Sequence, residues 1–151
     1  MAKVETMDFD YKICAYYALK QARDFKKIAE IAYDENLSFP DMVNIAFSCE
    51  LYLKAYIIWT TKSNLVIKKH LLADLFQLVD VKTQERIRSN SGIQYWDTFL
   101  NDSSDAFRQW RYYFEKDEVL FGHRGDFHQF ADALDAICSE RITVEAVINE
   151  S

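Results

Sequence analysis

The stretch of sequence that decides the fold runs from Met42 to Thr60 and reads MVNIAFSCELYLKAYIIWT. Apolar side chains occupy nearly every side of a helix drawn through it, and a helix without a polar face is typical of the centre of a helical protein. Residues 38–41 (SFPD) precede it with the pattern of a capping box and a proline in the first turn. We therefore expect a central, buried helix that opens at Ser38.

The composition favours long helices and few turns. The 151 residues include only three Gly and one Pro, whereas sheets joined by tight turns need more of both. Half of the residues are hydrophobic, which argues against disorder over most of the length. The length fits one domain over 1–151, without internal repeats or a linker. The sequence predicts an all-α, up-and-down bundle of five or six helices.

Apolar periodicity predicts helices on both sides of the central one. A first helix over 9–36 takes its spacing from Ile13, Tyr16, Tyr17, Lys20, Phe25, Ile28, Ala29 and Ala32. A third helix over 69–79 is expected to turn inward Leu71, Leu72, Leu75, Phe76 and Val79. A weaker fourth helix over 83–89 is predicted to stop at Gly92.

The last third of the chain is predicted to hold two more helices. Trp96, Phe99 and Leu100 are expected to form an aromatic turn. A helix that begins near Ser103 then carries a core-facing stripe of Phe107, Trp110 and Phe114. Gly122 and Gly125 break the chain, and residues 126–129 (DFHQ) open a last helix by a second capping box. Its inward face is predicted to be Phe127, Phe130, Ala131, Leu134, Ile137 and Cys138.

Glu50 and Lys54 are the charged exceptions in the apolar stretch. They have the favoured Glu-to-Lys order at i,i+4. On a helical wheel they share a face with Val43, Phe47, Ile57 and Ile58. Burying such a pair costs several kcal/mol per ion unless other groups satisfy it. Two interpretations stay open: a local pair at the edge of the buried face, or part of a larger polar network.

Arg111 and Glu115 pose the same question at the border of the predicted Phe107/Trp110/Phe114 stripe. Their Arg-before-Glu order supports a helix only weakly, so a border ion pair and a partner from elsewhere both remain open. His70 is either a surface or capping residue or a member of a polar site with Arg111. The predicted binding or polar cluster therefore consists of Glu50, Lys54, His70, Arg111 and Glu115.

Several kinds of site are disfavoured. The chain lacks a Gly-rich phosphate loop, a Gly-x-Ser-x-Gly elbow and a Cys-x-x-Cys pair. His123 and His128 do not have the i,i+4 spacing of two ligands on one helical face, so we expect no metal and no cofactor. A net charge of −6 argues against generic duplex DNA binding. Local basic residues beside aromatic ones leave a nucleotide or single-stranded site open.

Location is predicted from cysteines and hydropathy. Cys14, Cys49 and Cys138 are odd in number, far apart and set in apolar patterns, which favours buried thiols in a reducing cytoplasm. No stretch approaches the roughly 18 apolar residues of a membrane span, so no membrane partner is expected. Residues 1–5 include an acidic residue and no apolar region, so we expect no secretory signal.

Three motifs give the chain a resemblance to a known family. Residues 47–55 (FSCELYLKA), 69–76 (KHLLADLF) and 107–115 (FRQWRYYFE) resemble HEPN-type helical domains, in the same order and over roughly Val43 to Lys116. The likeness is to a bacterial subgroup with a Trp-Arg-Tyr-x-Tyr-Glu-like helix, in which Phe114 takes the place of the second Tyr. The resemblance implies a helical bundle that often dimerises, in a superfamily of RNA-cleaving toxins, defence proteins and nucleotide-binding relatives.

The ribonuclease motif of that family is an Arg, a polar residue, a few more positions and then a His. Arg111 falls where that Arg is expected, but Glu115 and Lys116 occupy the region of the His, and the next His is His123. A base poised near neutral pH is what cleavage at a 2′-hydroxyl needs. Arg124 and His128 have one position too few between them and straddle the predicted cap. No catalytic residue is therefore assigned.

These observations leave three functions open. The first is a divergent or inactive HEPN-like module that binds a nucleotide, an RNA or an antitoxin-type protein partner. The second is an active endoribonuclease, a toxin or defence protein that uses His70 or His123. The third is a structural homodimer. We expect weak or no ribonuclease activity, and Arg111 in or beside a cleft.

The aromatic content predicts self-association. Tyr112, Tyr113, Trp59 and Trp96 add to the Phe residues of the predicted stripes. A single small core does not hide so many rings, and leftover apolar patches usually mark a partner surface. Because twofold association is the commonest solution, we expect a homodimer.

Overall fold

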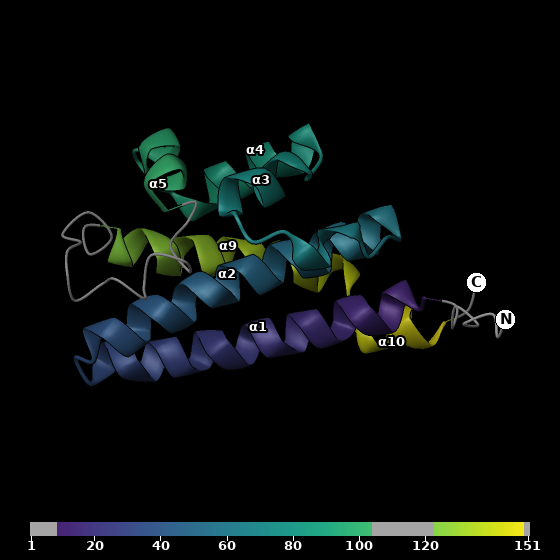
Figure 1. The fold of residues 1–151 in the computed structure, drawn as a ribbon, viewed down its shortest axis with the longest axis horizontal. Coiled ribbons are helices and arrows are strands. Elements are labelled where there is room, and N and C mark those ends of the chain that lie inside the picture. Colours follow the sequence, from purple (N-terminus) through teal and green to yellow (C-terminus); the bar gives the residue numbers. More distant parts are fainter. Residues whose placement is uncertain (1–8, 104–122, 150–151) are drawn as a thin grey trace, which may run out of the picture.

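The computed structural model describes residues 9–103 and 123–149, and within these ranges the protein contains helices and no β-strand. The all-α prediction is confirmed. Three long helices lie side by side, three shorter ones cover one side of them, and a last short helix packs against the first (Figure 1). They are α1 (Tyr11–Asp34), α2 (Ser38–Thr61), α9 (Arg124–Arg141), α3 (Leu72–Gln77), α4 (Val81–Ser91), α5 (Trp96–Ser103) and α10 (Val144–Ile148).

The described ranges hold more helices than the five or six expected, namely seven α-helices and the 3-10 helix η1 (Leu65–Lys68). Residues 96–103 form α5 where an aromatic turn was expected, and η1 and α10 were not predicted. Short helices are hard to predict because tertiary packing stabilises them more than local propensity does. The predicted helix with Phe107, Trp110, Arg111, Phe114 and Glu115, and the predicted break at Gly122, lie outside the described residues.

The central position of α2 is confirmed. It packs against α1 on one side and α9 on another, and every residue from Leu51 to Ile58 is buried. The helix begins at Ser38 as predicted, but its N-cap is Leu37, which makes no side-chain cap hydrogen bond. The carboxylate of Asp41, which would complete the capping box, is turned to the side chains of Arg124 and His128.

The buried face of α1 consists of small residues. Ala15, Ala22 and Ala29 recur every seven positions with Leu19 and Ala32 beside them, and all five are buried. Ser48 Oγ on α2 donates a hydrogen bond to the carbonyl of Ala22 at 2.7 Å. Alanines let the two helices approach closely. The large side chains of Ile13, Tyr17 and Ile28, which set the predicted spacing, are exposed on the other face of α1.

A tight turn reverses the chain between α1 and α2. Asn36 adopts φ 61°, its N–H donates to Tyr33 O at 3.1 Å, and the N–H of Leu37 donates to Ala32 O at 2.7 Å. This pair of bonds is a Schellman motif, and Asn tolerates its left-handed position. The turn brings the last residues of α1 next to the first turn of α2.

The last long helix begins earlier than predicted. His123 is its N-cap and Gly125 lies within its first turn, so the expected break at Gly125 and the capping box at residues 126–129 are wrong. Glycine costs about 1 kcal/mol in a helix interior, less than burial of one aromatic ring contributes. The inward face is confirmed in full, as Phe127, Phe130, Ala131, Leu134, Ile137 and Cys138 are all buried.

Aromatic contacts of Phe130 hold α9 against α5 and α3. Its ring centroid lies 5.3, 5.6 and 6.3 Å from those of Trp96, Phe99 and Phe76.

α4 ends as predicted at Gly92, which has φ 66°. Among the described helices, none combines the length and the apolar character that crossing a membrane requires.

Candidate functional site

The structure brings three of the five predicted cluster residues together. Lys54 Nζ lies 2.9 Å from Glu50 Oε2, and His70 Nδ1 lies 3.2 Å from the same oxygen and 3.4 Å from Lys54 Nζ. Glu50 is 2% exposed and Lys54 is buried, whereas His70 reaches solvent. The pair is therefore part of a small network and not a pair at the surface edge.

The remaining members of the predicted cluster, Arg111 and Glu115, lie outside the described residues. Within the described residues Glu50 Oε1 is buried and has no hydrogen-bond partner. A buried carboxylate oxygen without a donor is costly. The role of this cluster in binding stays a prediction.

A second polar cluster joins the starts of α2 and α9. The fully buried carboxylate of Asp41 accepts a hydrogen bond from Arg124 Nε through Oδ2, and its Oδ1 lies 2.5 Å from His128 Nε2. Arg124 and His128 are four residues apart and project from one face of α9. A single carboxylate thus holds an arginine and a histidine side by side.

The aromatic ring of Tyr33 completes this cluster. The α1–α2 turn places it so that the guanidinium carbon of Arg124 lies 4.2 Å from the ring centroid, a cation–π geometry, and the His128 ring packs edge-on at 5.2 Å. The Tyr33 side chain remains about half exposed. The cluster therefore presents an aromatic surface, a guanidinium and an imidazole.

A groove of about 580 Å³ opens beside the cluster. Its lining residues are Glu30, Tyr33, Asp34, Gly125, His128 and Gln129. Among residues 9–103 and 123–149, no atom lies within 4 Å of where a Cβ on Gly125 would be. A ligand can therefore come close to the first turn of α9, where backbone N–H groups and the helix dipole favour negative charge. Glu30 and Asp34 make the opposite wall acidic.

The geometry determines how His128 can act. Because a carboxylate only accepts hydrogen bonds, we assign the proton of this contact to Nε2, which leaves Nδ1 as a free acceptor in the neutral ring. A histidine oriented in this way by a carboxylate can act as a general base. Arg124 uses Nε for Asp41, and within the described residues its Nη2 is buried and lacks a partner.

His123 adds a third basic residue at the same end of α9. Its Nδ1 and Nε2 lie 2.9 Å from carboxylate oxygens of Asp126 and Asp102. Burial alone would lower the pKa of His123, but the hydrogen bonds and charges of the two carboxylates outweigh burial, and the pKa is raised. Both ring nitrogens are occupied, so His123 ties α9 to α5 and is not free to act as a base.

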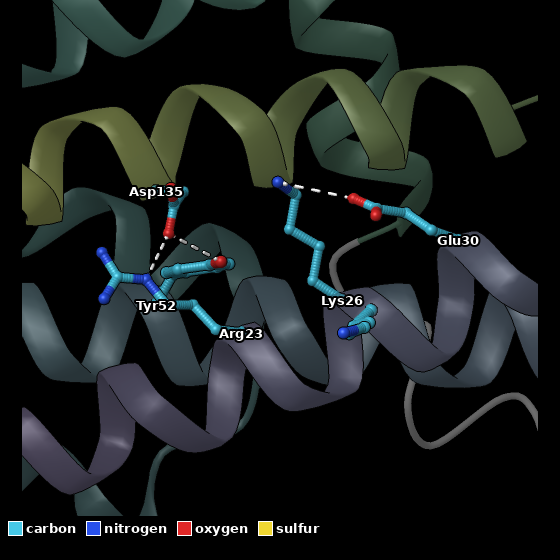
Figure 2. Close-up of a pocket in the computed structure, with 6 residues that line it drawn as sticks. Arg23, Lys26, Glu30, Tyr52 and Asp135 are labelled. Atoms are coloured by element: carbon cyan, nitrogen blue, oxygen red, sulfur yellow. Dashed lines mark hydrogen bonds and ion pairs between the residues drawn. The ribbon is translucent and has the colours of Figure 1, made fainter.

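A further polar group lies where α1, α2 and α9 run side by side (Figure 2). Asp135 accepts hydrogen bonds from Arg23 Nε at 2.8 Å and from the Tyr52 hydroxyl at 2.9 Å, and Lys26 Nζ lies 2.8 Å from Asp132. Burial raises the pKa of the Tyr52 hydroxyl, and the charge of Asp135 raises it further. A surface pocket of about 220 Å³ is lined by Arg23, Lys26, Tyr52 and Asp135, among others. Since these charges neutralise one another, this group links the three helices.

The cysteines carry no chemistry in the described structure. Cys49 and Cys138 are buried and Cys14 is half-buried, and all three are free thiols. Burial raises the pKa of each thiol, which favours its protonated form.

The sequence analysis did not select Asp41 or Tyr33 as site residues, and it did not place Arg124 beside His128. The signal was the i,i+4 spacing of Arg124 and His128, but the predicted break at Gly125 put the two residues on opposite sides of a helix start. The carboxylate of Asp41 was assigned to a cap of its own helix. Only the tertiary pairing of α2 with α9 shows that it serves another helix.

No protein-family model, no curated protein and no solved structure matches this chain.

Proposed function

We propose that this protein is a HEPN-like helical module that binds single-stranded RNA in the groove beside the start of α9. The observation that carries the proposal is the Asp41 carboxylate, which holds Arg124 and His128 side by side at the N-terminus of α9. The all-α architecture and the three sequence motifs agree with such a module.

Each wall of the groove suits a different part of a nucleotide. A phosphate at Gly125 would meet the backbone N–H groups of the first turn of α9 and the charge of Arg124. The exposed ring of Tyr33 offers a stacking surface for a base. The carboxylates of Glu30 and Asp34 can accept hydrogen bonds from base N–H groups. An unpaired base is required, which favours single strands over duplexes.

Cleavage of the bound RNA is a second candidate, and the orientation of His128 favours it. With Nε2 held by Asp41, Nδ1 would take the proton of a ribose 2′-hydroxyl. The 2′-oxygen would form a bond to the adjacent phosphorus while the bond to the 5′-oxygen breaks, and the leaving oxygen takes up a proton. Arg124 would stabilise the charge on the phosphate. The toxin or defence role implied by the resemblance belongs to this candidate.

The proposal is tested by titrating the protein into fluorescently labelled single-stranded RNA of mixed sequence and following anisotropy. We expect Arg124→Gln to weaken binding about tenfold, since charged hydrogen bonds to phosphate contribute roughly 1.5–3 kcal/mol. The matched control is Arg86→Gln, which removes an exposed arginine paired with Glu140. Circular dichroism confirms that each variant is folded. Wild-type protein that binds no RNA at 100 μM, or equal binding by both variants, contradicts the proposal.

The same samples test cleavage when the RNA is separated on a gel. If the second candidate holds, His128→Gln lowers the rate about 100-fold or more and His70→Gln leaves it unchanged. Comparing the cleavage rates of Arg111→Ala and Arg124→Gln shows which of the two arginines the reaction needs. Cleavage that depends on Arg111 and not on Arg124 contradicts the assignment to the α9 site.

A further inference from the structure

The outer face of α1 carries an apolar stripe. Ile13, Tyr17, Ile28 and Ile31 are 45%, 59%, 48% and 56% exposed. At 100° per residue they fall within about 60° of one another on the helix, opposite the buried alanines. Four large apolar side chains in one row on a solvent-facing helix indicate a surface that meets a partner.

Two opposite charges lie in the middle of the stripe. Lys20 and Asp24 are exposed and lie between Tyr17 and Ile28 on the same face. Within residues 9–103 and 123–149 neither side chain has an ion-pair partner. The stripe is therefore apolar at its two ends, with Lys20 and Asp24 between them and the exposed Lys27 at its border beside Ile28.

This pattern is symmetric about Ala22. Ile13 and Ile31 are equally far from Ala22 along the helix, and so are Lys20 and Asp24. A second α1 placed antiparallel across this point would bring Ile13 opposite Ile31 and Lys20 opposite Asp24, with Tyr17 opposite Lys27 and next to Ile28. A parallel copy would place Lys20 next to another Lys20 and Asp24 next to another Asp24.

We propose that two copies of this chain associate through α1, antiparallel, about a twofold axis that passes beside Ala22. Ile13 packs against the partner's Ile31, and Lys20 pairs with the partner's Asp24. Tyr17 packs beside the partner's Lys27 and Ile28. Every contact occurs twice, as an isologous interface requires.

The place of α1 in the fold permits this interface. It lies at the edge of the bundle, with α2 on its inner side and α9 beyond (Figure 1). The helix has 24 residues and is about 36 Å long, so the whole stripe can lie along a partner helix. On α1, Glu30, Tyr33 and Asp34 line the groove at the start of α9, whereas the proposed contact uses the neighbouring stripe with Ile28 and Ile31.

Charge exchange tests the pairing. By sedimentation at micromolar concentration we expect the wild type to be dimeric. Lys20→Glu and Asp24→Lys alone each bring like charges together in two symmetric pairs, and we expect the dimer Kd to rise at least about tenfold. The double variant Lys20→Glu/Asp24→Lys restores dimers. The controls Lys82→Glu and Asp74→Lys, at exposed positions of α4 and α3, leave the Kd unchanged.

Cross-linking tests the antiparallel register. On a Cys14→Ser background, Ile13→Cys and Ile31→Cys proteins are oxidised separately and mixed. The expected result is a disulfide-linked dimer in the mixture only. Cross-links in each protein alone would indicate a parallel pairing and overturn the proposal. A monomeric wild type, or single charge variants that dimerise like the wild type, would overturn it as well.

Discussion

Glu50 and Lys54 show how a charged pair is accommodated in a helix that is otherwise apolar. Their 2.9 Å contact is shielded from water, and only His70 connects it to the surface among the residues described. The attraction between the two ions offsets the loss of hydration only while both are present. The pair therefore stabilises the fold less than its short distance suggests, and it is sensitive to the loss of one member.

We expect Lys54→Met to lower the free energy of unfolding by about 3–5 kcal/mol, because it leaves Glu50 buried without its cation. The double variant Glu50→Leu/Lys54→Met should recover most of that loss, since apolar side chains of similar volume fill the same space. Urea unfolding followed by circular dichroism measures both. Lys82→Met, at an exposed site, is the control. A double variant as unstable as the single one would contradict this prediction.

His123 should make stability depend on pH. Its pKa is raised in the folded protein above the value of 6.5 that serves for the unfolded chain. The stabilisation is therefore complete below about pH 6.5 and is lost as the pH rises through the folded pKa. We expect the difference in unfolding free energy between wild type and His123→Gln to shrink between pH 6 and pH 9. A constant difference over this range would show that His123 does not carry the effect.

At the scale of single helices, α1 shows that a periodic pattern in the sequence can predict a helix without predicting which face of the helix is buried. The helix itself was predicted because large side chains recur with helical spacing. The buried face was not predicted, because Ala15, Ala22 and Ala29 are too weakly hydrophobic to indicate it. The large apolar residues Ile13, Tyr17 and Ile28 lie instead on the exposed face. Close packing of two helices selects small residues, and hydropathy does not record that selection.

The seam between α1 and α2 should tolerate no added volume. Ala22 has no exposed surface and its carbonyl accepts the bond from Ser48. We expect Ala22→Leu to cost at least about 1–3 kcal/mol of unfolding free energy, because the two helices must separate to admit it. Gln21→Leu, one position away and exposed, should change stability by less than about 0.5 kcal/mol. Thermal unfolding of the two variants compares them directly, and equal midpoints would contradict a tight seam.

At the scale of the whole molecule, the class of fold followed from the apolar run of α2 and from the scarcity of Gly and Pro. The polar cluster at the start of α9 did not, because its members come from α1, α2 and α9. Arg124 lies 83 positions beyond Asp41 in the chain. Asp41, Tyr33 and Arg124 each have an ordinary local explanation, as a cap, a surface aromatic and a loop cation. By contrast, Glu50 and Lys54 were predictable because their spacing on one helix already implies contact.

The side-chain ammonium of Lys12 donates a 2.6 Å hydrogen bond to the backbone carbonyl of Asn149, so α1 begins beside the point where α10 ends. Chain connectivity can therefore be rearranged without moving a helix. We expect a circular permutant that joins residue 149 to residue 9 by a short Gly/Ser linker, and opens the chain between Ser63 and Asn64, to keep the helical circular dichroism spectrum. A permutant opened within α2 between Leu53 and Lys54 should not fold. If the permutant opened between Ser63 and Asn64 also fails to fold, the order of the helices along the backbone matters more than their arrangement in space.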